Sequence, residues 1–255
     1  MNGLYVVAGA TGAIGKQICK NILQKGGTPV LVGRCYDKLN TLFDEEELYG
    51  KSPKIISEID FMDPKAAGKK LATELKGETI NGLVYSVGSI TLKPLRGCNV
   101  DDFMDSYTLN VLGAVETIKA TLPGLKKGSK VNNSSSIVLF SSIAARNGLA
   151  NHSVIGCSKA AIEGLTVSLA AEFASFPIRV NCVAPSLTAG GSTMAKPLTD
   201  NENIAAAVAA AHPIARLGNP EDSASAATFL LSSEASSWTT GSIIPVDGGR
   251  STILK

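Results

Sequence analysis

Three glycines near the start of the chain form its clearest chemical motif. They are Gly9, Gly12 and Gly15, in the segment AGATGAIGK at residues 8–16. This segment follows an apolar run at Leu4–Ala8 and begins an amphipathic stretch. Glycines at a strand-to-helix turn allow a tight turn, close approach of a pyrophosphate and close packing of the helix on the strand. The first amides of the helix also attract phosphate oxygens. We therefore expect a dinucleotide to bind at this turn, with contacts from Gly9, Thr11, Gly12, Ile14 and Gly15.

Arg34 indicates which dinucleotide would bind. It ends the second apolar run, which reads LVGR over residues 31–34. A site that prefers NAD usually places an acidic residue near this point, about 20 residues after the glycines, to bind the ribose diol. An arginine can instead hold the 2′-phosphate of NADP through two parallel hydrogen bonds. The sequence therefore favours NADP(H) over NAD(H).

Short apolar runs alternate with helix-length stretches along the chain. The runs are rich in Val, Ile and Leu on both faces, which is typical of strands buried on both sides of a parallel sheet. This alternation predicts an α/β fold with a doubly wound, mainly parallel seven-stranded sheet of Rossmann type. We expect strands at Leu4–Ala8, Pro29–Gly33, Lys54–Asp60, Gly82–Ser86, Ser136–Ser141, Arg179–Ala184 and Ser242–Val246. We expect helices near residues 13–25, 36–49, 64–76, 100–122, 153–175 and 219–232.

The domain organisation follows from the absence of any linker-like shift in composition. We expect a single dinucleotide-binding domain over residues 1–255. The least regular stretch, about 185–215, is expected to form a substrate loop, because long segments of this kind in compact folds are often binding loops. Within it, His212 lies between an alanine-rich run and Pro213. We expect this histidine to end a helix and face solvent.

Composition excludes several classes of function. The 24 Lys and Arg residues nearly balance the 22 Asp and Glu residues, and no basic run appears, so we expect no nucleic-acid or membrane partner. The five cysteines are scattered without a CxxC pair, which argues against a metal site and a disulfide framework. Scattered free thiols fit a reducing compartment. We therefore expect a cytoplasmic protein that acts on a small molecule.

The order of further motifs resembles the short-chain dehydrogenase/reductase family over nearly the whole chain. The matching segments are EIDFMD, LNVLGAV, IVLFSSIAA, GCSKAAIEGL and IRVNCVAPS. The resemblance implies a catalytic set made of Asn110, Ser142 and Lys159. It also implies cofactor contacts from Asp60, Gly88, Lys159 and Pro185.

Four features depart from the family pattern. The glycine spacing is that of the extended subfamily, and the family's NNAG segment is YSVG here. The family's Pro-Gly turn has become Pro185-Ser186. Most importantly, the tyrosine of the YxxxK motif is missing. Counting four residues back from Lys159 and thirteen on from Ser142 both lead to Ile155.

Ile155 changes the chemistry that the family performs. Family members reduce a carbonyl with hydride from nicotinamide, and the tyrosine donates the proton. Three interpretations stay open. In the first, another group supplies the proton, above all His152 and more weakly Tyr107. His152 lies seven residues before Lys159, which is the spacing at which enoyl-reductase relatives place their tyrosine. Alternatively, the substrate is an enoyl or dienoyl thioester, whose oxygen needs only hydrogen-bond donors. Finally, the chain is a catalytically silent NADP(H)-binding subunit or regulatory protein.

Assembly is the last expectation from the sequence. The stretch 153–175 carries more apolar surface than one face of a sheet needs. In the relatives that the chain resembles, this helix and the one holding Asn110 form a dimer face. We therefore expect a homodimer or homotetramer, or pairing with an active homologue.

Overall fold

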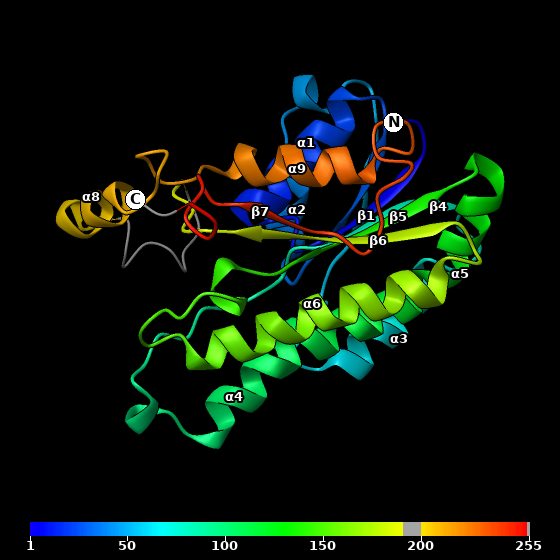
Figure 1. Ribbon diagram of the computed structural model, residues 1–255. Helices are drawn as coiled ribbons and strands as arrows, with labels where there is room; N and C mark the ends of the chain where they lie inside the picture. The colour runs from blue at the N-terminus through cyan, green and yellow to red at the C-terminus, as the bar shows by residue number, and fades with distance from the viewer. Residues whose placement is uncertain (191–199, 254–255) are drawn as a thin grey trace.

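The computed structural model describes residues 1–190 and 200–253, and its centre is a seven-stranded sheet. Every neighbouring pair of strands is parallel, in the order β3-β2-β1-β4-β5-β6-β7. The predicted doubly wound sheet is therefore confirmed (Figure 1). The strands are β1 (Leu4–Ala8), β2 (Thr28–Val32), β3 (Lys54–Ile56), β4 (Ile80–Tyr85), β5 (Ser135–Phe140), β6 (Ile178–Pro185) and β7 (Ile243–Val246).

Helices cover both faces of the sheet. One face carries α1 (Ala13–Gln24) and α9 (Pro220–Leu231), with the short α2 (Tyr36–Asn40) nearby. The other face carries α3 (Pro64–Glu74), α5 (Gly113–Asn132) and α6 (Ser153–Phe173). Helix α4 (Val100–Tyr107) runs into α5 through a π-helical turn at Thr108–Leu112. Helix α8 (Glu202–Ala210) lies beyond the carboxyl edge of the sheet (Figure 1).

Two apolar clusters form the core, one on each face of the sheet. Alternate residues of β1 divide between them, with Val6 on the side of α5 and α6 and Val7 on the side of α1 and α9. Because side chains alternate along a strand, a strand that is apolar throughout fills both clusters at once. This explains why the continuous apolar runs of the sequence become central strands.

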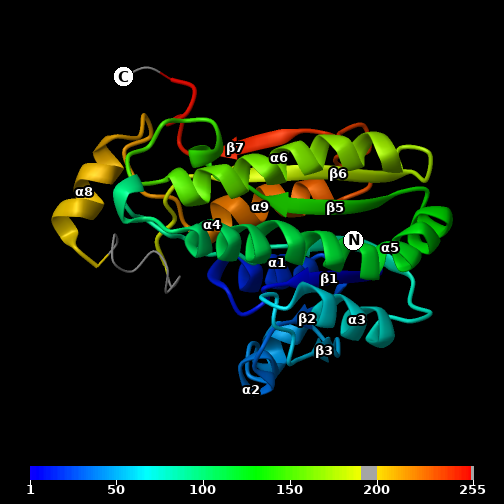
Figure 2. The same cartoon turned by 90° about the horizontal axis from the view of Figure 1, so that it is seen from below.

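Helix α6 is apolar almost all round. Its length and composition alone would allow it to cross a membrane, and 44% of the relevant window is buried inside the fold. It packs on β6, as the core helices of many proteins do. Its outer side leaves apolar residues such as Val167 exposed. Figure 2 shows that α5 and α6 lie side by side on this face of the molecule.

Some predicted elements have different limits in the structure. The predicted helix at 36–49 is replaced by α2 and a separate 3-10 helix at Glu45–Leu48, which Asp44 caps. The predicted third strand ends at Ile56, four residues early. The predicted helix at 100–122 is interrupted by the π-helical turn and extends to Asn132. The expected loop at 185–215 contains α8, and its residues 191–199 lie outside the described part of the chain.

Candidate active site

The candidate site lies where the strand order changes direction, between β1 and β4. In open α/β sheets, ligands bind in the crevice outside the carboxyl ends of the strands at such a point. Ser86, just after β4, joins the two strand ends here. Its amide and its hydroxyl both donate to the Ala8 carbonyl oxygen, at 3.0 and 2.8 Å. The two chain segments that would contact a bound dinucleotide are thereby held side by side.

The glycine turn after β1 has the geometry that its sequence predicts. Gly9 has a φ of +84°, a conformation that side chains disfavour. A Cβ on Gly15 would lie 2.2 Å from the Gly9 carbonyl oxygen, so helix α1 packs directly against the turn. Gly12 has an ordinary φ of −73° and precedes the first residue of α1. The first amides of α1 have no partner within the helix and can meet phosphate oxygens.

Arg34 and Asp60 lie beyond the ends of β2 and β3. The Arg34 side chain is exposed, and its carbonyl oxygen accepts a hydrogen bond of 3.0 Å from the Glu58 amide. Asp60 Oδ1 accepts from the Met62 amide at 3.0 Å, which fixes the carboxylate at the turn. Both side chains stand at the edge where the adenosine half of a dinucleotide would lie.

Gly88, Asn110 and Lys159 converge at the end of β4. A Cβ on Gly88 would lie 2.8 Å from Asn110 Oδ1 and 3.2 Å from Lys159 Nζ. The π-helical turn before α5 places Asn110 here, and its Nδ2 donates to the Ser106 carbonyl at 2.8 Å. Its Oδ1 is buried and has no hydrogen-bond partner among the described residues. An unpartnered buried oxygen beside a lysine is suited to a polar ligand or water.

Lys159 is a buried cation on helix α6. Its Nζ donates to the Phe140 carbonyl oxygen at 2.9 Å. Burial lowers its pKa to about 8, because desolvation disfavours the charged ammonium. Ile155, one helical turn earlier, shares this face and is 3% exposed. Position 155 therefore presents hydrocarbon where the resembling family presents a phenol.

Ser142 lies at the carboxyl end of β5. Its Oγ accepts a hydrogen bond of 3.2 Å from the Ala144 amide and so begins a short 3-10 helix at Ile143–Ala145. The side chain is half-buried. Ser142, Lys159 and Asn110, which the sequence places far apart, thus come from β5, α6 and the turn before α5 to one end of the sheet.

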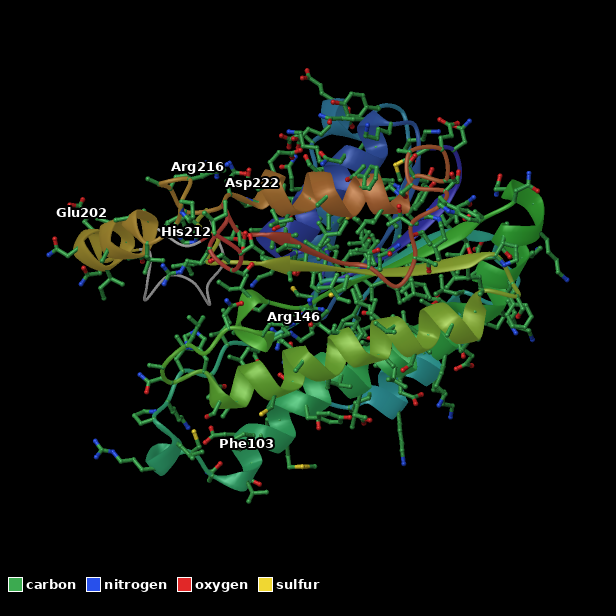
Figure 3. All side chains as sticks on the ribbon, in the orientation of Figure 1. Phe103, Arg146, Glu202, His212, Arg216 and Asp222 are labelled. Atoms are coloured by element: carbon green, nitrogen blue, oxygen red, sulfur yellow. The ribbon has the colours of Figure 1, made fainter. Side chains whose placement is uncertain are left out.

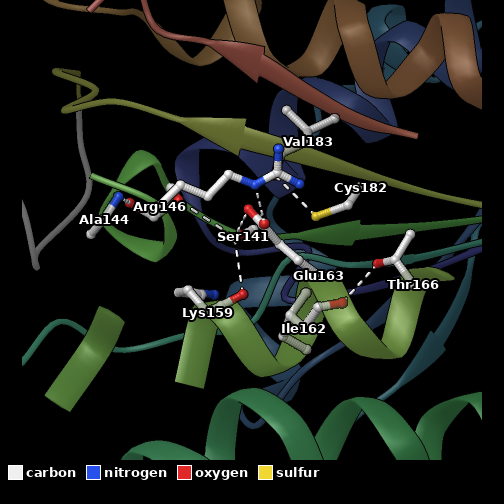
Figure 4. Close-up of polar contacts among 10 residues, drawn as sticks. Ser141, Ala144, Arg146, Lys159, Ile162, Glu163, Thr166, Cys182 and Val183 are labelled. Atoms are coloured by element: carbon white, nitrogen blue, oxygen red, sulfur yellow. Dashed lines mark hydrogen bonds and ion pairs between the residues drawn. The ribbon is translucent and has the colours of Figure 1, made fainter. Parts of the chain in front are cut away.

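A polar cluster beneath Ser142 was not expected from the sequence. Ser141 Oγ lies 3.0 Å from both the Lys159 carbonyl oxygen and Glu163 Oε1, either of which can accept its proton. Glu163 also forms an ion pair with Arg146 (Figure 4). Glu163 follows Lys159 by four residues. This spacing places both residues on one face of a helix and could have predicted that Glu163 lies near the site. The cluster ties the loop after β5 to helix α6.

The two histidines have different surroundings. His152 is half-buried just before α6, and its Nδ1 lies 2.6 Å from the Ala150 carbonyl, to which it donates. Two helical turns, about 10 Å of rise, separate it from Lys159. The expectation that His212 faces solvent is wrong, because its side chain is buried and its ring contacts Ser186 and Val208. Ser186, directly after Pro185, supplies the polar partner that makes this burial possible.

These features together fit a nicotinamide dinucleotide. The first amides of α1, which follow the glycine turn, have no partner within the helix and can meet phosphate, and Arg34 offers an exposed cation beyond the end of β2. Asn110 Oδ1 and Lys159 Nζ provide an acceptor and a donor at the opposite end. The residues present therefore match both ends of such a cofactor.

Comparisons with known proteins show which family the chain belongs to. A family model described as enoyl-(acyl carrier protein) reductase matches residues 9–251. A tropinone reductase homolog from Arabidopsis thaliana is 29% identical over 96% of this chain and 90% of that protein. Carbonyl reductase family member 4 from Danio rerio is 32% identical over 98% of both chains. An inactive 2-(S)-hydroxypropyl-CoM dehydrogenase 2 from Xanthobacter autotrophicus is 33% identical over 68% of this chain and 74% of that protein.

Solved structures show the same architecture. A short-chain type dehydrogenase/reductase from Mycobacterium ulcerans superposes with a TM-score of 0.87 at 28% identity, covering 98% of this chain and 90% of that one. ElxO with NADP bound superposes with a TM-score of 0.84 at 26% identity, covering 98% and 99%. These matches support a nicotinamide cofactor for the present chain. The chain belongs to the short-chain dehydrogenase/reductase family and is an oxidoreductase of that type.

Proposed function

We propose that this protein is an NADP(H)-dependent reductase of a small-molecule carbonyl or of an enoyl or dienoyl thioester, with a proton donor other than residue 155. The observation that carries the proposal is the convergence of Asn110 Oδ1 and Lys159 Nζ at Gly88, beside a buried Ile155. When bound, the reduced dinucleotide supplies a hydride to the substrate. The chain itself must orient the substrate oxygen and stabilise the charge that develops there.

Three residues of the chain would perform that second task. The Ser142 hydroxyl can donate to the substrate oxygen, because its contact with the Ala144 amide uses only its acceptor side. The buried Lys159 ammonium stabilises negative charge more strongly than an exposed one would, since little water screens it. Asn110 would hold water or substrate through its unpartnered Oδ1.

The substrate class follows from the missing phenol. Reduction of a ketone requires a proton on oxygen, and His152 is the donor that the sequence suggests. Reduction of a conjugated thioester places the hydride on the β-carbon. Hydrogen-bond donors then stabilise the enolate oxygen until water protonates the α-carbon. The match to a model described as enoyl-(acyl carrier protein) reductase supports including thioesters.

Arg34 tests the preference for NADP(H). Arg34→Ala should weaken NADPH binding by at least about tenfold and leave NADH nearly unchanged, because only NADPH carries the 2′-phosphate. Fluorescence titration of both cofactors measures this. Lys38→Ala, which removes an exposed cation on the neighbouring α2, is the matched control. Equal losses for both cofactors in Arg34→Ala would refute the preference.

Turnover is tested with a panel of probes. NADPH oxidation is followed with tropinone, a 3-oxoacyl thioester and an enoyl thioester, while cofactor occupancy is measured in parallel. Ile155→Tyr should create or raise ketone reduction by about 10²-fold, the lower end of what a positioned acid contributes. A variant that binds NADPH but gains no activity would show that the remaining groups do not address a carbonyl.

A silent cofactor-binding subunit is the second candidate function. The buried Ile155 favours it, and so does the similarity to a dehydrogenase named as inactive. Wild-type protein that binds NADPH and leaves the whole panel unchanged would support this candidate.

Assembly and location complete the proposal. Met104 of α4 and Val167 of α6 are 55% and 52% exposed, and they suit an interface between subunits of a homodimer or homotetramer, or with an active homologue. The five cysteines are all free thiols, which fits the cytoplasm.

A further inference from the structure

Ser186 and His212 form a hydrogen-bonded pair at the carboxyl edge of the sheet. Ser186 Oγ lies 2.7 Å from His212 Nε2, although the two residues are 26 positions apart. The other ring nitrogen, Nδ1, lies 2.7 Å from the Val208 carbonyl oxygen of α8. His212 is only 2% exposed, whereas Ser186 is half-buried. Ser186 is therefore the member of the pair that a substrate can reach.

The hydrogen bonds define how this pair can handle protons. A carbonyl oxygen only accepts, so Nδ1 of His212 must carry a hydrogen toward Val208. In the neutral ring, Nε2 is then the acceptor and receives the Ser186 hydroxyl hydrogen. In the doubly protonated ring, Nε2 donates to Ser186 Oγ instead. A proton can thus pass between Ser186 and Nε2 while the ring keeps its orientation.

Ser186 leaves the sheet next to Ser142. The Ser186 amide donates to the Val246 carbonyl at 3.2 Å and so continues the pairing of β6 with β7. On its other side, β6 pairs with β5, and the Ser141 amide donates to the Val183 carbonyl at 2.9 Å. Ser142 and Ser186 therefore emerge from adjacent parallel strands at the same edge of the sheet.

Ser186 is the first residue after β6, the strand on which helix α6 packs. Cys182 belongs to the apolar cluster on that face, and Val183 belongs to the opposite cluster. Within β6, which ends at Pro185, Ala184 follows Cys182 to the same face. Lys159 and Ile155 also lie there, on α6. Figure 3 shows His212 beside α8 and Arg146 nearer the middle of the molecule, where its ion-pair partner Glu163 lies on α6.

We propose that Ser186 is the catalytic proton donor of this protein and that His212 is the residue that positions and reprotonates it. The proposal rests on the proposed function and names the donor that it requires. Isoleucine at 155 removes the family's hydroxyl from α6, and serine, where the resembling family has glycine, adds one directly after β6, the strand on which α6 packs. His152 lacks such an arrangement, because its contact with Ala150 is local and two helical turns separate it from Lys159.

In alcohol oxidation, the Ser186–His212 pair acts as the base. The alcohol proton passes to Ser186 Oγ as the Ser186 proton passes to Nε2 of the neutral His212 ring. A bound oxidised dinucleotide would accept the carbinol hydrogen as hydride, with both electrons of the C–H bond, so that the alcohol becomes a carbonyl. The protonated ring then releases one proton to solvent. Reduction runs these transfers backwards, so His212 must carry both ring protons before turnover.

The kinetic test compares Ser186→Gly with wild type on whichever probe of the panel wild type converts fastest. Loss of the hydroxyl should lower kcat by about 10²-fold and leave the NADPH dissociation constant within about twofold. Ser233→Gly, at an exposed serine at the opposite edge of the sheet, is the matched control and should keep wild-type kcat. Adding Ile155→Tyr to Ser186→Gly should recover at least about tenfold in kcat, because it restores a proton donor, whereas a purely structural defect would not be rescued.

A spectroscopic test needs no turnover. The chain has two histidines, so nitrogen NMR of the imidazoles gives two ring systems, and His152→Gln assigns them. Wild type should show His212 protonated on Nδ1, and Ser186→Gly should shift the Nε2 signal alone. Unchanged kcat in Ser186→Gly, or an unchanged Nε2 signal, would overturn the Ser186 proposal and leave the proposed function intact. Failure of wild type to convert any probe while NADPH is bound would overturn both.

Discussion

The buried lysine of the candidate site should make the stability of the protein depend on pH in an unusual direction. Burial lowers the pKa of Lys159 from 10.5 to about 8. Between these two values, the unfolded chain still holds the proton that the folded chain has lost. Because the unfolded state then binds more protons, raising the pH increases the free energy of unfolding. Lys159→Met removes this contribution.

The size of the effect follows from the shift. One unit of pKa corresponds to about 1.4 kcal/mol, so the difference between the two states of Lys159 amounts to about 3 kcal/mol. The buried charge weakens the fold by this amount below pH 8. The penalty disappears progressively between pH 8 and pH 10.5, where the neutral amine still keeps its contact with the Phe140 carbonyl.

Urea denaturation between pH 7 and pH 10.5 measures the effect as a difference between proteins. Tyrosines, cysteines and other lysines titrate in the same range, but they are common to wild type and Lys159→Met and cancel. Relative to Lys159→Met, wild type should gain about 3 kcal/mol across this interval. Lys38→Met, at an exposed lysine, should follow wild type. Parallel profiles for wild type and Lys159→Met would refute the account of a desolvated ammonium.

Three substitutions test the packing around the site. Gly15→Ala places a Cβ 2.2 Å from the Gly9 carbonyl oxygen, and urea denaturation should show a loss of about 1–3 kcal/mol; wild-type stability would contradict the close packing. Gly88→Ala brings a Cβ to 2.8 Å from Asn110 Oδ1. Fluorescence titration should then show at least about tenfold weaker NADPH binding. Unchanged affinity would show that Gly88 and Asn110 do not belong to the cofactor site. Glu163→Leu removes the ion-pair partner of Arg146 and one of the two acceptors beside Ser141 Oγ. It should cost about 1 kcal/mol by thermal unfolding, with an unchanged melting temperature as the opposing result.

The sheet could be predicted because its strands are buried on both faces. Residues 4–8 form β1 as expected, and the ends of β5 and β6 differ from expectation by one residue. The stretch 36–49 could not be predicted as well. Its periodicity suggests one helix, but Leu42 and Phe43 turn into the core and Asp44 caps a new 3-10 turn, so packing overrides the local pattern.

Some parts of the candidate site could likewise be predicted from the sequence, and others could not. The glycine turn and Arg34 could be located because a phosphate-binding turn needs neighbouring residues of fixed type and spacing. The environment of His212 could not, because its partner Ser186 lies 26 residues away and nothing in the local sequence indicates burial. The pairing of Glu163 with Arg146 also depends on the loop after β5 folding back onto α6.

The Ser186–His212 pair has a physical cost that helps to identify its role. A buried imidazole loses its hydration, and this loss is tolerable only when both ring nitrogens find partners. Ser186 and Val208 provide those partners, and they do so from β6 and α8, two elements that the sheet core does not require to be linked in this way. Residues that act as one unit lose their function together, so their substitutions do not add. Ser186→Gly combined with His212→Gln should therefore lower kcat no further than Ser186→Gly alone, whereas multiplied losses would show that the two side chains act independently.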